Sequence, residues 1–148
     1  VDSPQAVEEM RVAVLAEAAS NSSSSSSASS SSERVASVGL DCEWRPGDAN
    51  PVSILQVALL SEVFLVDVLA LCGGGGSDEG EARVADDDSS SSAQASELSA
   101  GERALADFLE DMLSHPHLVK LGFGFSFDLK RLAQSYPRSL GPALAEAP

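Results

Sequence analysis

Residues 35–44 constrain the fold of this chain more than any other segment. Apolar positions alternate there with small or polar ones, and successive side chains of a β-strand point to opposite faces of a sheet. Asp41 and Glu43 therefore project from one face, whereas Leu40 and Trp44 project from the other. The pattern predicts a strand that ends with two carboxylates side by side.

Neighbouring carboxylates are unfavourable, because each one raises the proton affinity of the other. A hard divalent cation such as Mg²⁺ or Mn²⁺ removes this cost, since it prefers oxygen ligands. Taken alone, however, an Asp-x-Glu sequence is also found where a strand simply runs out into solvent. The rest of the chain has to distinguish a metal site from a solvated strand end.

A second informative segment lies near the carboxyl end of the sequence. It predicts a short strand over 118–123, a glycine-containing turn, and a helix over 126–136 with Asp128 in its first turn. An acid at this position is also stabilised by the helix dipole alone. Beside Asp41 and Glu43, Asp128 favours a site of three carboxylates.

These segments resemble the DEDD 3′–5′ exonucleases, and in particular the branch of ribonuclease D and the Werner-type exonucleases. The first motif of that family, Asp-x-Glu on the first strand, is matched by Asp41 and Glu43. The Asp of its second motif stands in a Gly-x-x-x-x-x-Asp-Leu context, which residues 122–129 match. The resemblance covers about residues 35–70 and 98–137.

The resemblance implies a ribonuclease H-like α/β fold, in which helices flank a mixed sheet. It also implies hydrolysis of nucleic-acid phosphodiester bonds from the 3′ end by two Mg²⁺ or Mn²⁺ ions. Asp41 would bridge both ions, Glu43 would help to hold the ion that carries the attacking water, and Asp128 would reach the ion beside the leaving group.

Several residues near these carboxylates are candidates for contact with the substrate. They are Leu40, Trp44, Phe125, Lys130 and Arg131. For most of these residues a purely structural role remains an alternative. Trp44 and Phe125, like the neighbouring Phe127, are also suited to core packing, and the two cations are also suited to a solvated helix face.

The third motif of the family, a Tyr or His four residues before a final Asp, has no match. The sequence contains no Asp after Asp128. We therefore expect residues 1–148 to form a single partial exonuclease domain, incomplete at its C-terminus and inactive or nearly so by itself.

Two low-complexity segments interrupt this domain, a polyserine insertion at 20–34 and a Gly/Ser/acidic insertion at 73–97. Neither can bury enough apolar surface to offset its ordering entropy, so we expect both to be mobile. The remaining residues, about 110, suffice for one modest core. Their patterns predict a helix that begins at Ser3-Pro4, and strands over 52–60 and 63–68 that are joined by a hairpin turn. They also predict a helix with a capping box at Ser99. The buried stripe of this helix consists of Leu105, Phe108, Leu109, Met112 and Leu113.

The net charge of −14 argues at first against a nucleic-acid partner, because phosphate binding needs cationic surface. The charges are unevenly distributed, however. Residues 78–111 hold eleven acids and two arginines, whereas 114–138 hold four basic residues and only Asp128 as an acid. Since metal ions take over part of the phosphate contact in such enzymes, a nucleic-acid 3′ end remains the predicted partner.

The remaining sequence signals concern location and alternatives. No apolar stretch approaches the roughly 20 residues of a membrane span, the amino terminus lacks a secretory pattern, and the two cysteines have no disulfide or zinc spacing. These signals predict an intracellular protein, nuclear or cytoplasmic, with no membrane partner. The competing interpretations are a non-catalytic module that binds nucleic acid or protein and an acidic scaffold, and no motif distinguishes RNA from DNA.

Overall fold

The computed structural model describes residues 1–22, 36–47, 50–73 and 97–145. Its elements in chain order are α1 (Pro4–Ser22), β1 (Ala36–Trp44), β2 (Val52–Ala58), β3 (Val63–Asp67), α2 (Val68–Cys72), α3 (Ala100–Ser114), β4 (Leu118–Leu121), α4 (Phe125–Ser135) and α5 (Gly141–Ala145). Most of the two predicted insertions, 20–34 and 73–97, lies outside the described residues, so their mobility stays a prediction, as does the assignment of a single partial domain.

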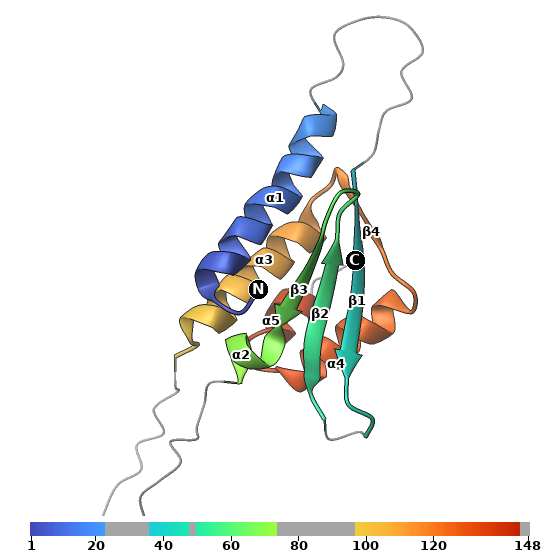
Figure 1. The fold of residues 1–148 in the computed structure, drawn as a ribbon. Coiled ribbons are helices and arrows are strands. Elements are labelled where there is room, and N and C mark those ends of the chain that lie inside the picture. The colour runs from blue at the N-terminus through green and yellow to red at the C-terminus, as the bar shows by residue number, and fades with distance from the viewer. Residues whose placement is uncertain (23–35, 48–49, 74–96, 146–148) are drawn as a thin grey trace, which may run out of the picture.

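The four strands form one mixed sheet in the order β3-β2-β1-β4 (Figure 1). β1 is antiparallel to β2 and parallel to β4, so the strand that carries Asp41 and Glu43 is central. β2 and β3 are antiparallel, and the Leu59 amide donates to the Glu62 carbonyl (2.8 Å) in the turn between them. The predicted α/β architecture with a mixed sheet is confirmed, as is the predicted hairpin.

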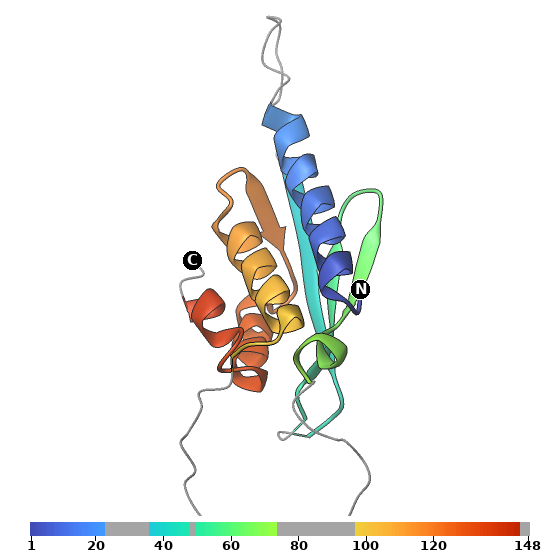
Figure 2. The same ribbon diagram turned by 90° about the vertical axis from the view of Figure 1, so that its left-hand side faces the viewer.

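The hydrophobic core lies between one face of the sheet and the helices α1 and α3, which run side by side (Figures 1 and 2). From β1 it takes Val38, Leu40 and Cys42, and the whole predicted stripe of α3 is buried. The other sheet face is turned to the viewer in Figure 1, and no helix of the described chain lies in front of β2 and β3. Asp41 and Glu43 are exposed on this open face.

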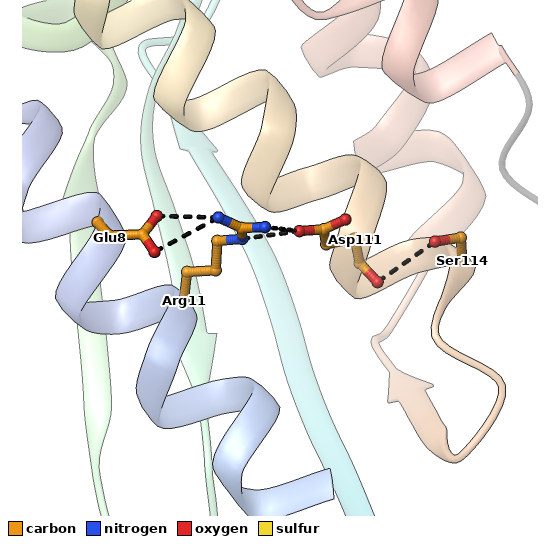
Figure 3. A network of polar contacts seen from close by, with 4 residues as sticks. All are labelled: Glu8, Arg11, Asp111 and Ser114. Atoms are coloured by element: carbon orange, nitrogen blue, oxygen red, sulfur yellow. Dashed lines mark hydrogen bonds and ion pairs between the residues drawn. The ribbon is translucent and has the colours of Figure 1, made fainter. Parts of the chain in front are cut away.

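α1 and α3 are also joined by a charged contact (Figure 3). Arg11 donates through Nε to Asp111 Oδ2 (2.7 Å), and its Nη2 binds the same oxygen. On its own helix, Arg11 Nη1 pairs with Glu8 Oε2 (3.1 Å). The contact is partly exposed, so we assign it a small stabilising role beside the apolar packing of the two helices.

Local signals account for the start of the longer helices. Ser3 Oγ accepts from the Ala6 amide (3.3 Å), with Pro4 as the first helical residue. Ser99 and Glu102 form the predicted capping box, in which Ser99 Oγ accepts from the Glu102 amide (3.1 Å) and Glu102 Oε2 accepts from the Ser99 amide (2.7 Å). These contacts satisfy amides that the first turn leaves unpaired.

The structure differs from the sequence predictions in several places. β2 ends at Ala58 rather than at residue 60, and β4 ends at Leu121 rather than at residue 123. α1 continues to Ser22 and so extends into the predicted polyserine insertion, because elongation of an existing helix costs little. Two five-residue helices, α2 and α5, were not predicted. Asp67 caps α2, since its Oδ1 accepts from the Ala70 amide (2.9 Å), and this ends the third strand one residue earlier than expected.

None of the helices in the described ranges is both long enough and apolar enough to cross a bilayer.

Candidate active site

The site begins at the end of β1, where the strand pairing becomes irregular. Glu43 pairs with Ile54 and Trp44 with Val52, so Ser53 is an extra residue on β2 and forms a bulge. Bulges bend a strand and change the direction of neighbouring side chains, and they occur often beside active sites. Asp41 and Glu43 remain exposed here, and Gln56 Nε2 makes one long contact with Glu43 Oε1 (3.5 Å).

Two glycines between β4 and α4 bring the second segment against β1. A Cβ added at Gly122 would lie 2.8 Å from the Leu40 carbonyl oxygen, so only glycine allows this approach. Gly124 has open space around its Cβ position but adopts φ +70°, which glycine tolerates best. It precedes α4, and its carbonyl accepts from the amides of Phe127 (2.7 Å) and Asp128 (3.2 Å).

Asp128 lies in the first turn of α4 and is only 7% exposed. Its Oδ2 is buried and has no hydrogen-bond partner among the described residues. Burial raises the pKa of Asp128 above its ordinary value, and the charges of Asp41 and Glu43 raise this pKa further. The three carboxylates that the sequence singled out are therefore close enough to interact electrostatically.

These residues are of the right chemical type to bind a divalent cation, but their side chains are not gathered into a complete site. A buried carboxylate oxygen without a partner and two exposed carboxylates whose charges act on it are donors of the kind that Mg²⁺ and Mn²⁺ take. Within the described ranges, however, no three His, Cys, Asp or Glu side chains are gathered closely enough to hold an ion as they stand. The exposed side chains of Asp41 and Glu43 would have to turn toward Asp128.

Three aromatic and cationic side chains from the segments around the carboxylates contact one another. The ring centroids of Trp44 and Phe127 are 6.0 Å apart, and the Arg131 guanidinium lies over the Trp44 ring at 5.6 Å. Arg131 Nη2 donates to the carbonyls of Gly47 (3.1 Å) and Asn50 (2.7 Å), so α4 is tied to the loop after β1.

The other predicted substrate contacts are distributed differently. Leu40 is buried on the core face of β1, and Phe125 is half-buried against the core. Lys130 is exposed on α4. The structure thus brings Trp44 and Arg131 together, and it places Leu40 and Phe125 mainly as packing residues. Whether any of these side chains contacts a substrate stays a prediction.

Two contacts that support the site were missed by sequence reasoning. Tyr136 donates to the Val52 carbonyl (2.6 Å), and Ser135 Oγ accepts from the Val52 amide (3.0 Å). Together they attach the end of α4 to the start of β2. No local pattern indicates a contact between residues separated by more than eighty positions, so no signal in a single sequence could have found it.

No protein-family model matches this chain. Over 104 residues, which are 68% of the chain, it is 33% identical to the Exonuclease mut-7 homolog of Homo sapiens. The chain spans only 9% of the length of that relative. Its fold is similar to that of the crystal structure of the Aedes aegypti Nibbler EXO domain, with a TM-score of 0.51 and 21% sequence identity, over 95% of this chain and 44% of that one.

The solved structure supports the fold, and the human relative adds a likeness in sequence. The likeness in fold agrees with the mixed sheet of this chain. At modest sequence identity, these findings support the assignment of this chain as a DEDD 3′–5′ exonuclease-type domain.

Proposed function

We propose that this chain carries the metal-binding carboxylates of a 3′–5′ exonuclease that hydrolyses nucleic-acid phosphodiester bonds. The observation that supports this most is the state of Asp128. A buried carboxylate oxygen without a partner is costly, and nearby like charges add to the cost. A bound cation would remove both penalties.

Asp41, Glu43 and Asp128 would hold the Mg²⁺ or Mn²⁺ ions, which when bound activate a water and stabilise the leaving 3′-oxygen. The fold contributes the placement of these carboxylates. β1 is central in the sheet and therefore rigid, and Asp128 is held by the first turn of α4. The three carboxylates are not gathered as they stand within the described ranges, so we expect hydrolysis by this chain to be slow.

A second function, nucleic-acid binding without catalysis, is favoured by one observation. The carboxylates are not gathered into a ready ligand cluster within the described residues. A module that has kept the fold but lost the chemistry would have this property. The two functions predict different behaviour with a cleavable strand and a divalent cation.

The test is a single-turnover assay with the chain in excess over end-labelled single-stranded RNA or DNA, in the presence of Mn²⁺. Slow shortening from the 3′ end that disappears in Asp41→Ala supports the exonuclease. Shortening that survives Asp41→Ala contradicts the proposed site. A strand that is bound but never shortened favours the binding module. The exposed Glu110→Gln variant on α3 controls for the change in net charge.

A further inference from the structure

One arginine side chain connects the two segments that carry the candidate carboxylates. Arg131 lies on α4, three residues after Asp128. Its guanidinium lies over the ring of Trp44, at 5.6 Å from the ring centroid, and Trp44 directly follows Glu43 at the end of β1. Arg131 therefore reaches from the helix of one carboxylate to the strand end of another.

The same guanidinium also holds the loop that follows β1. Arg131 Nη2 donates to the carbonyls of Gly47 (3.1 Å) and Asn50 (2.7 Å). Asn50 closes this loop on itself, since its amide donates to the Gly47 carbonyl (3.2 Å) and its Nδ2 donates to the Pro46 carbonyl (2.8 Å). The loop is thus folded by its own hydrogen bonds and attached to α4 by Arg131.

We propose that Arg131 is a positioning residue, which holds the end of β1 against α4 and thereby sets the span across which Glu43 and Asp128 share a metal ion. This role rests on the function proposed above and adds the residue that joins the two halves of the site. Within the described ranges the carboxylates are not gathered closely enough to hold an ion as they stand. Metal binding should therefore be sensitive to small changes in this span.

The chemistry of the side chain supports positioning rather than the role of a free cation. A guanidinium is planar and carries several donors, so one group can lie over a ring and bind carbonyl oxygens at its edge. Arg131 does both. Its Nε is buried and has no hydrogen-bond partner among the described residues, which is a local cost. Costs of this kind are expected at functional positions rather than at positions selected for stability alone.

The sign of the effect on Mn²⁺ binding separates positioning from simple electrostatics. A cation near a metal site repels the metal ion, so removal of its charge alone would strengthen Mn²⁺ binding. For Arg131→Met we expect the opposite, a loss of affinity of about tenfold in calorimetric titration, which is typical of residues that orient metal ligands. Arg131→Lys keeps the charge but lacks the planar group, so its affinity should also lie below that of the parent.

Two other arginines provide matched controls. Arg45 follows Trp44 and is exposed, so Arg45→Met removes a cation from the same neighbourhood and should bind Mn²⁺ at least as tightly as the parent. Arg11 joins α1 to Asp111 on α3. Arg11→Met therefore tests whether the loss of a contact between two elements is enough to weaken Mn²⁺ binding, and its affinity should equal that of the parent. Urea unfolding checks that each variant is folded.

A second measurement needs no metal. Trp44 is the only tryptophan of the chain, so its fluorescence reports on the end of β1. In EDTA, the emission of Arg131→Met and of Arg131→Lys should shift to longer wavelengths and be quenched more strongly by acrylamide, because the guanidinium no longer covers the ring. Arg45→Met and Arg11→Met should keep the emission of the parent.

Unchanged or stronger Mn²⁺ binding in Arg131→Met, or parental affinity in Arg131→Lys, would overturn the positioning role. An unchanged Trp44 emission in both variants would overturn it as well, and so would an equal loss of affinity in Arg11→Met. If Arg131→Met does not fold, Arg131→Lys decides by the same two measurements. The result is separable from that of the proposed function. A parent chain that binds no Mn²⁺ would reject the metal site and the metal role of Arg131, whereas the emission would still decide whether Arg131 holds β1 against α4.

Discussion

The hydroxyl of Tyr136 donates a buried hydrogen bond of 2.6 Å to the backbone carbonyl of Val52. The amide of Val52 donates in turn to Ser135 Oγ (3.0 Å). Both polar groups of one residue at the start of β2 thus contact the end of α4. Because α4 carries Asp128 and β2 pairs with β1, these two bonds help to fix the distance between the helix carboxylate and the strand carboxylates.

Tyr136→Phe removes the donor of the buried bond and keeps the ring. We expect the free energy of unfolding to fall by about 1 kcal/mol, the usual contribution of such a bond. The free energy of unfolding is measured by urea denaturation of the variant and the parent. Ser114→Ala is the control, since this exposed hydroxyl makes only a long contact (3.4 Å), and its effect should stay below about 0.5 kcal/mol. A Tyr136→Phe variant as stable as the parent would show that this bond does not hold α4.

Gly122→Ala should destabilise the chain, because the new Cβ would lie 2.8 Å from the Leu40 carbonyl oxygen and 3.0 Å from Phe125 Cδ2. Overpacking of this kind costs about 1–3 kcal/mol. The backbone would have to move away from β1, so the affinity for Mn²⁺ should fall as well. Gly141→Ala provides the comparison, since nothing lies within 4 Å of its Cβ position. Similar stability in the two variants would exclude a tight approach at Gly122.

The raised pKa of Asp128 predicts a definite pH dependence without metal. The folded state keeps this proton to a higher pH than the unfolded chain, whose ordinary pKa is 3.8. Stability from this group is therefore complete below that value and is lost as the pH rises through the raised pKa of the folded state.

Asp128→Asn removes this titration. The stability of the variant relative to the parent should therefore increase from pH 4 to pH 7, as measured by thermal or urea unfolding in EDTA. The exposed Asp107→Asn should show no such trend. A constant difference between Asp128→Asn and the parent across this range would mean that Asp128 is not desolvated in the folded chain.

Both thiols should be unreactive in the folded protein. Burial, followed by the charges of Asp128, Asp41 and Glu43, raises the pKa of Cys42 to about 12. Burial and Glu102 raise the pKa of Cys72 to about 12 as well. At pH 8 only about one thiol in ten thousand would be ionised, and the thiolate is the reactive form. Ellman's reagent should therefore react slowly before unfolding and rapidly in denaturant, and rapid reaction of the folded chain would contradict this.

Sequence reasoning succeeded where the signal is local. The alternation around Asp41 and Glu43 predicted their common face, and the capping box at Ser99 predicted the start of α3, because both depend on neighbours a few positions away. The position of Asp128 in the first turn of α4 followed from the glycines before it and the helical pattern after it.

Contacts between segments that are distant in the sequence could not be predicted from the sequence. Arg131 was considered as a phosphate contact, yet its Nη2 binds the Asn50 carbonyl, 81 positions away. The bulge opposite Trp44 depends on the register between two strands, which no single strand specifies. The burial of Asp128 likewise results from the packing of α4 on the sheet, so only the structure reveals it.

Asp41, Glu43 and Asp128 are proposed to share a divalent cation. This proposal is tested most directly by calorimetric titration of Mn²⁺ into the parent chain, Asp41→Ala, Asp128→Asn and the surface variant Glu110→Gln. We predict saturable heat for the parent and for Glu110→Gln, and its loss in the other two variants. Equal heats from all four proteins would mean that Mn²⁺ is attracted only by the overall acidity of the chain, and this result would contradict the proposed site.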